Sequence, residues 1–156
     1  MALVRILVDG YSLLHSWPEL AEGAPRHSET ARDALIEMLT AYQDASGTPV
    51  TVFFDGRGNR KLKPKSAGDK AIEVLFSNSG QTADDLIERA AHRFQPYGEV
   101  LAVTNDFAER DTVTAFGGLA MSCENFIRQI QNALADLQES LNNHNRRERN
   151  RFFRTR

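Results

Sequence analysis

Short apolar runs of strand length alternate along this chain with longer segments of helical periodicity. Parallel strands need a crossover connection of a dozen or more residues, and a helix usually supplies it. The alternation therefore predicts an α/β fold in which helices flank a central, mostly parallel sheet. The runs expected to form strands are 4–8, 50–54, 72–76 and 100–104, with a weaker one at 114–116.

Three longer helices are expected, and capping or turn residues mark their ends. The first covers about 29–45, because Ser28 can cap its start and Gly47 can end it. The second follows Thr82, whose spacing to Asp85 is that of a capping box. The third follows Ser122, and apolar residues recur at helical spacing from Phe126 to Leu141.

The composition fits a single globular domain. The chain has 156 residues, of which 41% are hydrophobic and 26% are charged. Its only cysteine, Cys123, has no partner for a disulfide within the chain, so we expect a reducing, cytoplasmic location. Since no apolar run approaches the roughly 20 residues of a membrane span, we expect no membrane partner. The sequence does not indicate an oligomeric state.

Charge is unevenly distributed along the chain. Residues 146–156 carry six arginines and one glutamate, whereas the rest of the chain is net acidic. We therefore expect residues 1–142 to form the folded domain and residues 143–156 to form a basic, flexible tail. Arginines interspersed with phenylalanines favour contact with RNA or the ribosome, and a solvated terminus is the alternative.

Five aspartates lie near the ends of the predicted strands and the start of the second helix. Asp9, Asp55 and Asp106 follow strands, where ligands bind in open parallel sheets. Asp84 and Asp85 lie in the first turn of the helix, where capping is the alternative explanation, and Asp55 could instead mark a turn. Asp9 is the strongest candidate, because between an apolar strand and a glycine it is expected to have no capping role.

Four of these carboxylates, Asp9, Asp84, Asp85 and Asp106, are expected to converge on one rim of the sheet. Carboxylates at close quarters cannot all stay ionised without a cation that offsets their repulsion. Ligand sets made only of oxygen favour Mg²⁺ or Mn²⁺. This pattern indicates metal-assisted attack of water on a phosphodiester.

Other catalytic patterns are not found in the sequence. The four histidines lack the spacing of a zinc site, and neither a G-x-S-x-G elbow nor a glycine-rich phosphate motif occurs. A phosphoacceptor role for Asp9 is disfavoured, because D-G-Y lacks the second acid of a D-x-D phosphatase motif.

Four segments resemble, in order, the motifs of the YacP-like NYN ribonucleases, a branch of the PIN-like nuclease superfamily. They are ILVDGYSLLHSWPEL (6–20), VFFDG (52–56), EVLFSNSGQTADDLIER (73–89) and LAVTNDFAERD (101–111). The resemblance implies a PIN-like three-layer fold and a metal-dependent endoribonuclease that uses Mg²⁺ or Mn²⁺. It also implies RNA as a partner, with ribosome-associated mRNA as a candidate substrate.

The resemblance also assigns roles to individual residues. The family's catalytic, metal-binding acids fall on the four aspartates named above as converging on one rim. Thr82, Thr104 and Asn105 match flanking polar positions that orient the metal ligands or the substrate. Asp55 matches the acid after the second strand, where a supporting role is expected.

One residue departs from the family pattern. The family usually has D-G-Y-N where this chain has Ser12, which is expected to bind the substrate. A hydroxyl lacks an amide's reach and its two donor hydrogens, so the change is expected to weaken catalysis or alter how the scissile phosphate is held. A catalytically weak or inactive RNA- or ribosome-binding module of the same fold is therefore the alternative function. Arg57, Arg60 and Lys61 lie in a basic loop at 56–70 that is expected to bind single-stranded RNA, with solvated loop charge as the alternative.

Overall fold

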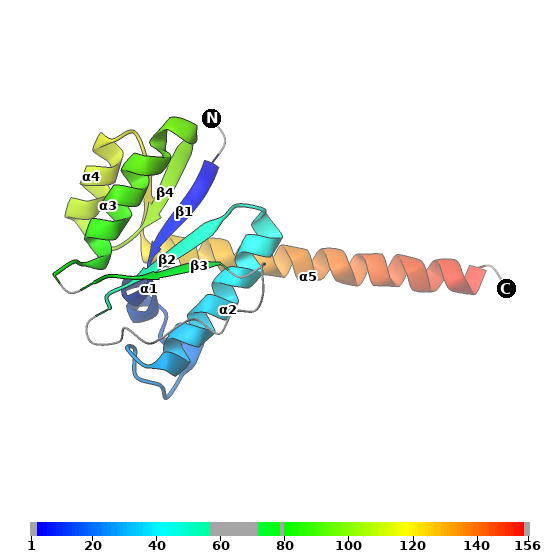
Figure 1. Cartoon of the computed structure of the whole chain (residues 1–156). Coiled ribbons are helices and arrows are strands. Elements are labelled where there is room, and N and C mark those ends of the chain that lie inside the picture. The colour runs from blue at the N-terminus through cyan, green and yellow to red at the C-terminus, as the bar shows by residue number, and fades with distance from the viewer. Residues whose placement is uncertain (1–2, 57–71, 79, 155–156) are drawn as a thin grey trace.

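A parallel β-sheet forms the centre of the molecule. The computed structural model describes residues 3–56, 72–78 and 80–154, and within these ranges five strands form one sheet in the order β3-β2-β1-β4-β5 (Figure 1). All four pairs of neighbouring strands are parallel, which confirms the predicted α/β fold. The strands are β1 (Leu3–Asp9), β2 (Val50–Phe54), β3 (Glu73–Phe76), β4 (Glu99–Val103) and β5 (Leu119–Met121).

Helices cover both faces of this sheet and make three layers (Figure 1). The helices are α1 (Gly10–Ser16), α2 (Glu29–Ser46), α3 (Ala83–Phe94), α4 (Phe107–Ala115) and α5 (Cys123–Arg154), with short 3-10 helices η1 (Pro18–Ala21) and η3 (Gln95–Tyr97). Successive strand residues point to opposite faces, so Ile6 and Val8 pack with α1, α2 and α5, whereas Leu7 packs with α3 and α4. All five residues of β2 are buried, as expected for a strand covered on both faces.

The predicted capping residues define the ends of the two helices for which they were identified. The Ser28 side chain accepts a hydrogen bond from the Ala31 amide at the start of α2. Gly47 ends α2 in the left-handed region, with a φ of 75°, which glycine adopts without steric cost. Thr82 and Asp85 form both hydrogen bonds of a capping box at the start of α3.

The structure corrects the sequence analysis between β4 and β5. The strand predicted at 114–116 is wrong, because residues 114 and 115 belong to the end of α4. Glu109 and Val113 lie four residues apart and are both buried, which is the spacing of one helix face. Gly117, with a φ of 88°, then turns the chain before β5 begins. The short helices α1 and α4 were not predicted.

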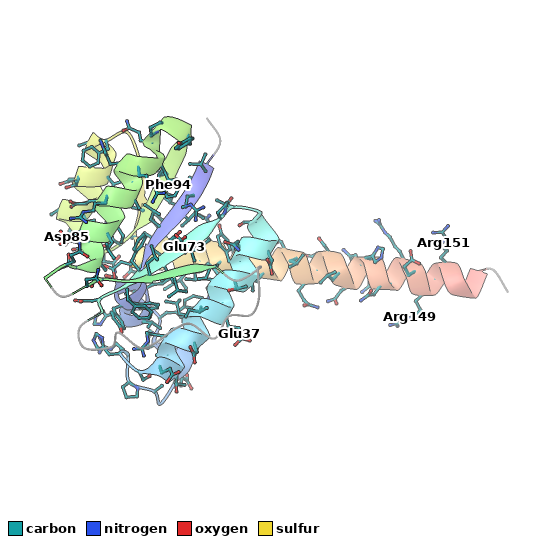
Figure 2. The ribbon with its side chains drawn as sticks, in the orientation of Figure 1. Glu37, Glu73, Asp85, Phe94, Arg149 and Arg151 are labelled. Atoms are coloured by element: carbon teal, nitrogen blue, oxygen red, sulfur yellow. The ribbon has the colours of Figure 1, made fainter. Side chains whose placement is uncertain are left out.

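Helix α5 begins in the core and ends in solvent. Phe126 and Ile130 near its start are buried against the sheet, whereas all residues from 135 to 151 are exposed. Figure 2 shows Arg149 and Arg151 on the part of α5 that extends away from the sheet. The helix is continuous across residue 142, and the division into a domain and a flexible tail stays a prediction. Among the described helices, none combines the length and apolar character of a membrane span.

Candidate metal centre

The candidate site lies where the strand order of the sheet reverses. From β1, the chain continues to β2 on one side, and β4 joins β1 on the other side. In open α/β sheets, ligands bind in the crevice outside the carboxyl ends of the strands at such a switch point. Asp9 is the last residue of β1, and Thr104 follows the last residue of the neighbouring β4.

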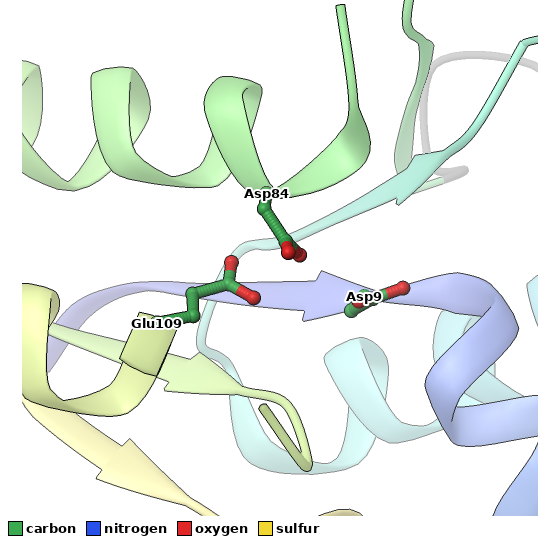
Figure 3. Close-up of side chains that lie close together, drawn as sticks. All are labelled: Asp9, Asp84 and Glu109. Atoms are coloured by element: carbon green, nitrogen blue, oxygen red, sulfur yellow. The ribbon is translucent and has the colours of Figure 1, made fainter. Parts of the chain in front are cut away.

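Three carboxylates from three elements meet at this point. Asp9 comes from the end of β1, Asp84 from the first turn of α3 and Glu109 from α4 (Figure 3). Each offers an oxygen atom, and these oxygens all lie within 4.8 Å of one another. The structure thus brings together two of the four predicted acids and adds Glu109, which the sequence analysis missed.

Glu109 is the least compensated of the three acids. Its side chain is only 2% exposed, and neither buried carboxylate oxygen has a hydrogen-bond partner in the described part of the chain. Burial is the main cause that raises the pKa of Glu109 from its ordinary 4.5 to about 9, and the carboxylates of Asp84 and Asp9 also raise it. A buried acid without donors strongly favours either a proton or a cation beside it.

Asp9 has more support than Glu109. It caps α1, because its Oδ1 accepts a hydrogen bond from the Ser12 amide (3.3 Å) and its Oδ2 accepts one from the Ser12 hydroxyl (3.0 Å). The prediction that Asp9 has no capping role is therefore wrong. Burial is the largest cause that raises the pKa of Asp9 from 3.8 to about 6; Asp84 adds to this effect, and the Ser12 hydrogen bonds oppose it.

This donor set fits a hard divalent cation. The clustered ligand atoms are all carboxylate oxygens, which suit Mg²⁺ or Mn²⁺ better than zinc. A cation placed among them would offset the burial and the mutual repulsion that raise the pKa of Asp9 and Glu109, and it would give the two orphaned oxygens of Glu109 a partner. The three acids are therefore suited to hold such an ion.

The other two predicted acids cap helices beside the cluster. The Asp85 carboxylate accepts a hydrogen bond from the Thr82 amide (3.1 Å) within the capping box of α3. Asp106 caps α4 and accepts hydrogen bonds from the amides of Ala108 (2.9 Å) and Glu109 (3.4 Å). Neither residue belongs to the three-carboxylate cluster, and their roles as metal ligands stay predictions.

The polar residues predicted beside the site make mainly internal contacts. The Asn105 side chain donates to Ser16 Oγ (3.0 Å) and Glu124 Oε1 (3.1 Å) and accepts from the Cys123 amide (2.9 Å). It thus ties the end of β4 to α1 and α5. Thr104 is buried, and its Oγ1 accepts a hydrogen bond from the backbone amide of Asp106 (3.1 Å).

A cavity of about 550 Å³ opens beside Asp9 and Asp84. Its lining includes Ser12, Thr82 and Asp55, three residues predicted to bind or support the substrate. Asp55 Oδ1 accepts a hydrogen bond from the Ser77 hydroxyl (3.2 Å), which links the ends of β2 and β3. The predicted RNA-binding residues Arg57, Arg60 and Lys61 lie outside the described residues.

A local signal could have identified Glu109. The sequence D-F-A-E (106–109) lies shortly after β4. An aspartate three residues before a glutamate has the spacing of a capping box. That pattern would start a helix at Asp106 and place Glu109 in its first turn. The inward direction of the side chain follows from the packing of α4 against the sheet, which the sequence does not state directly.

Comparisons with known proteins agree with the fold and its motifs. The sequence matches the YacP-like NYN domain family over residues 6–155. It is 31% identical over 127 residues to the uncharacterized protein YacP of Bacillus subtilis, and this alignment covers 81% of this chain and 74% of that protein. The structure is similar to the crystal structure of Rae1 (YacP) from Bacillus subtilis, with a TM-score of 0.73, 27% identity and coverage of 91% of this chain and 80% of that one. A mutant of the same protein gives a TM-score of 0.71 at 28% identity, with coverage of 86% and 79%.

Proposed function

Because the chain belongs to the YacP-like NYN domain family, which supports a nuclease-like, RNA-related function, we propose that it is a metal-dependent endoribonuclease. The observation that carries this proposal is the convergence of Asp9, Asp84 and Glu109 at the switch point of the sheet. The orphaned oxygens of Glu109 support a cation there, and the adjoining cavity gives access to a substrate.

The chain's own residues hold this site in place. Bound Mg²⁺ or Mn²⁺ would supply activation of water and neutralise charge on the scissile phosphate. Ser12 fixes the carboxylate of Asp9 with two hydrogen bonds. The capping box of Thr82 holds the first turn of α3, which carries Asp84, and Asp106 holds the first turn of α4, which carries Glu109. Each acid is therefore placed before a cation binds.

We further propose single-stranded RNA as the substrate, with mRNA on the ribosome as a candidate source. The acidic cluster attracts cations but repels phosphates, so affinity for RNA must come from elsewhere on the chain. The exposed, arginine-rich end of α5 supplies positive charge that attracts the phosphate backbone. The alternative, a binding module without catalysis, would use the same basic surface.

The test is cleavage of a labelled pool of single-stranded RNA in Mg²⁺, in Mn²⁺ or in a chelator. We compare the wild type with Asp9→Asn and with Asp33→Asn, a control that removes an exposed carboxylate on α2. The proposal predicts metal-dependent cutting by the wild type and the control, and loss of cutting by Asp9→Asn while its fold is retained. RNA binding without cutting in any divalent ion would overturn the enzyme proposal in favour of the binding module.

A further inference from the structure

Two aromatic side chains line the same cavity as the acids. Tyr11 follows the Asp9-Gly10 pair at the start of α1, and His27 lies just before α2, yet both border the cavity that contains Asp9 and Asp84. Their ring centroids lie 4.4 Å apart, and the ring planes are inclined by 52°. Two aromatic rings thus form a corner beside the metal-binding acids.

Buried neighbours hold this corner in place. Phe54, which is fully buried, makes an edge contact with Tyr11 at a centroid distance of 5.1 Å. Arg32 is only 4% exposed, and its Nη1 donates to the Tyr11 hydroxyl (3.1 Å) and to the His27 carbonyl (2.6 Å). One buried guanidinium therefore holds the Tyr11 hydroxyl and the backbone of His27, which reduces the conformational entropy that ligand binding would cost.

The exposure of His27 separates this corner from an ordinary core contact. The Tyr42–Phe126 pair is also in edge contact, but both of its residues are buried and contribute to the hydrophobic core. His27 is exposed, and the core clusters do not include it. An exposed ring that a buried arginine helps to position beside a cavity is available to a planar ligand.

We propose that Tyr11 and His27 form a stacking subsite for one nucleobase of the RNA strand, beside the phosphate that reaches Asp9 and Asp84. This inference rests on the proposed function and gives it a physical basis for choosing single strands. In a duplex, neighbouring bases cover both faces of each base, whereas an unpaired base can leave the stack and lie against an aromatic ring. Every base has a π-face, so this subsite tolerates different sequences.

The test measures binding of a fluorescent ten-nucleotide single-stranded RNA in a chelator, by anisotropy. A series of RNAs carries one abasic nucleotide at each position in turn. For the wild type, an abasic nucleotide at one position should weaken binding about 5- to 150-fold. This is the change in affinity that corresponds to the free energy of one base–aromatic stack. His27→Ala should show a similar loss with intact RNA and little further loss with that abasic RNA, because the two changes remove the same interaction.

Two variants serve as controls. His27→Phe keeps an aromatic ring and should bind intact RNA within about 3-fold of the wild type, since stacking needs no ring nitrogen. His92→Ala removes an exposed histidine from the last turn of α3, at the opposite end of that helix from Asp84, and should leave the affinity unchanged. Thermal unfolding of each variant checks that the fold is intact.

The outcomes separate this inference from the proposed function. If the wild type cuts RNA but neither His27→Ala nor any abasic position changes the affinity, the subsite is refuted and the nuclease stands. If no divalent ion supports cutting, but one abasic position weakens RNA binding by the wild type and not by His27→Ala, the subsite stands and the nuclease proposal fails. If His27→Phe binds intact RNA as weakly as His27→Ala does, the aromatic face does not hold the base and the stacking role is overturned.

Discussion

Replacement of Glu109 by glutamine should stabilise the metal-free protein at neutral pH. Glutamine keeps the shape of the side chain but cannot ionise. In the folded protein, burial raises the pKa of Glu109 from 4.5 to about 9. Above pH 4.5, the unfolded chain therefore releases this proton while the folded chain retains it. Each step up in pH then favours the unfolded state until the pH reaches about 9.

The size of the effect follows from this difference in pKa. Each pH unit within the window costs about 1.4 kcal/mol, so the loss between pH 4.5 and pH 7 reaches at most about 3.5 kcal/mol. Below pH 4.5, Glu109 is protonated in both states and does not lower the free energy of unfolding. Above pH 4.5, the free energy of unfolding falls progressively up to about pH 9. Glu109→Gln removes this loss, so its advantage over the wild type should grow with pH.

Urea unfolding in a chelator at pH 5, 6, 7 and 8 measures the difference. The free energy of unfolding of Glu109→Gln minus that of the wild type should rise by about 1.4 kcal/mol per pH unit. Asp111→Asn, which removes an exposed acid from the same helix, should not show this rise. Mn²⁺ should stabilise the wild type but not Glu109→Gln. A difference that does not change with pH, or a variant less stable than the wild type at pH 7, would mean that burial does not raise the pKa of Glu109 in the folded protein.

Three further predictions concern the parts that support the site. Thr82→Ala removes the cap of α3 and should lower the free energy of unfolding, measured in urea, by about 0.5–2 kcal/mol. A cleavage assay should also show slower cutting, because Asp84 lies in the same turn. Gly10→Ala would place a Cβ 2.3 Å from the buried ring of Phe54, so thermal unfolding should report a loss of about 1–3 kcal/mol. Replacing the four arginines at 146–151 with glutamine should reduce the slope of log affinity against log salt by about 0.7 for each phosphate that these arginines neutralise; an unchanged slope would mean that this segment does not bind RNA.

Four of the five described strands, β1 to β4, could be predicted from the sequence because their signals are local. Parallel strands that are buried on both faces appear as continuous apolar runs, such as 50–54, which matches β2. The helices α1 and α4 are 7 and 9 residues long, and so few turns give too little periodicity to distinguish a helix from a loop. The missing α4 also explains the misplaced strand at 114–116, because residues 114 and 115, which end α4, were assigned to an extended segment.

The site could be predicted only in part, since it depends on contacts between distant elements. Local signals identify Asp9 and Asp84: Asp9 lies at the end of a strand, and Asp84 lies in the first turn of a capped helix. Glu109 enters the cluster through the packing of an unpredicted helix. The hydroxyl of Ser12 donates a hydrogen bond to the Asp9 carboxylate. This contact depends on helix α1, which was not predicted from the sequence.

One rate comparison shows whether the three clustered carboxylates support metal-dependent RNA cleavage. We would measure the single-turnover rate of cutting a labelled single-stranded RNA in Mn²⁺ for the wild type, Asp84→Asn, Glu109→Gln and the control Asp111→Asn. Asp84→Asn and Glu109→Gln should each lose at least about 100-fold in rate, the cost of removing an essential electrostatic group, whereas Asp111→Asn should cut as fast as the wild type. Cleavage by Glu109→Gln at the wild-type rate would mean that the clustered carboxylates do not carry the reaction.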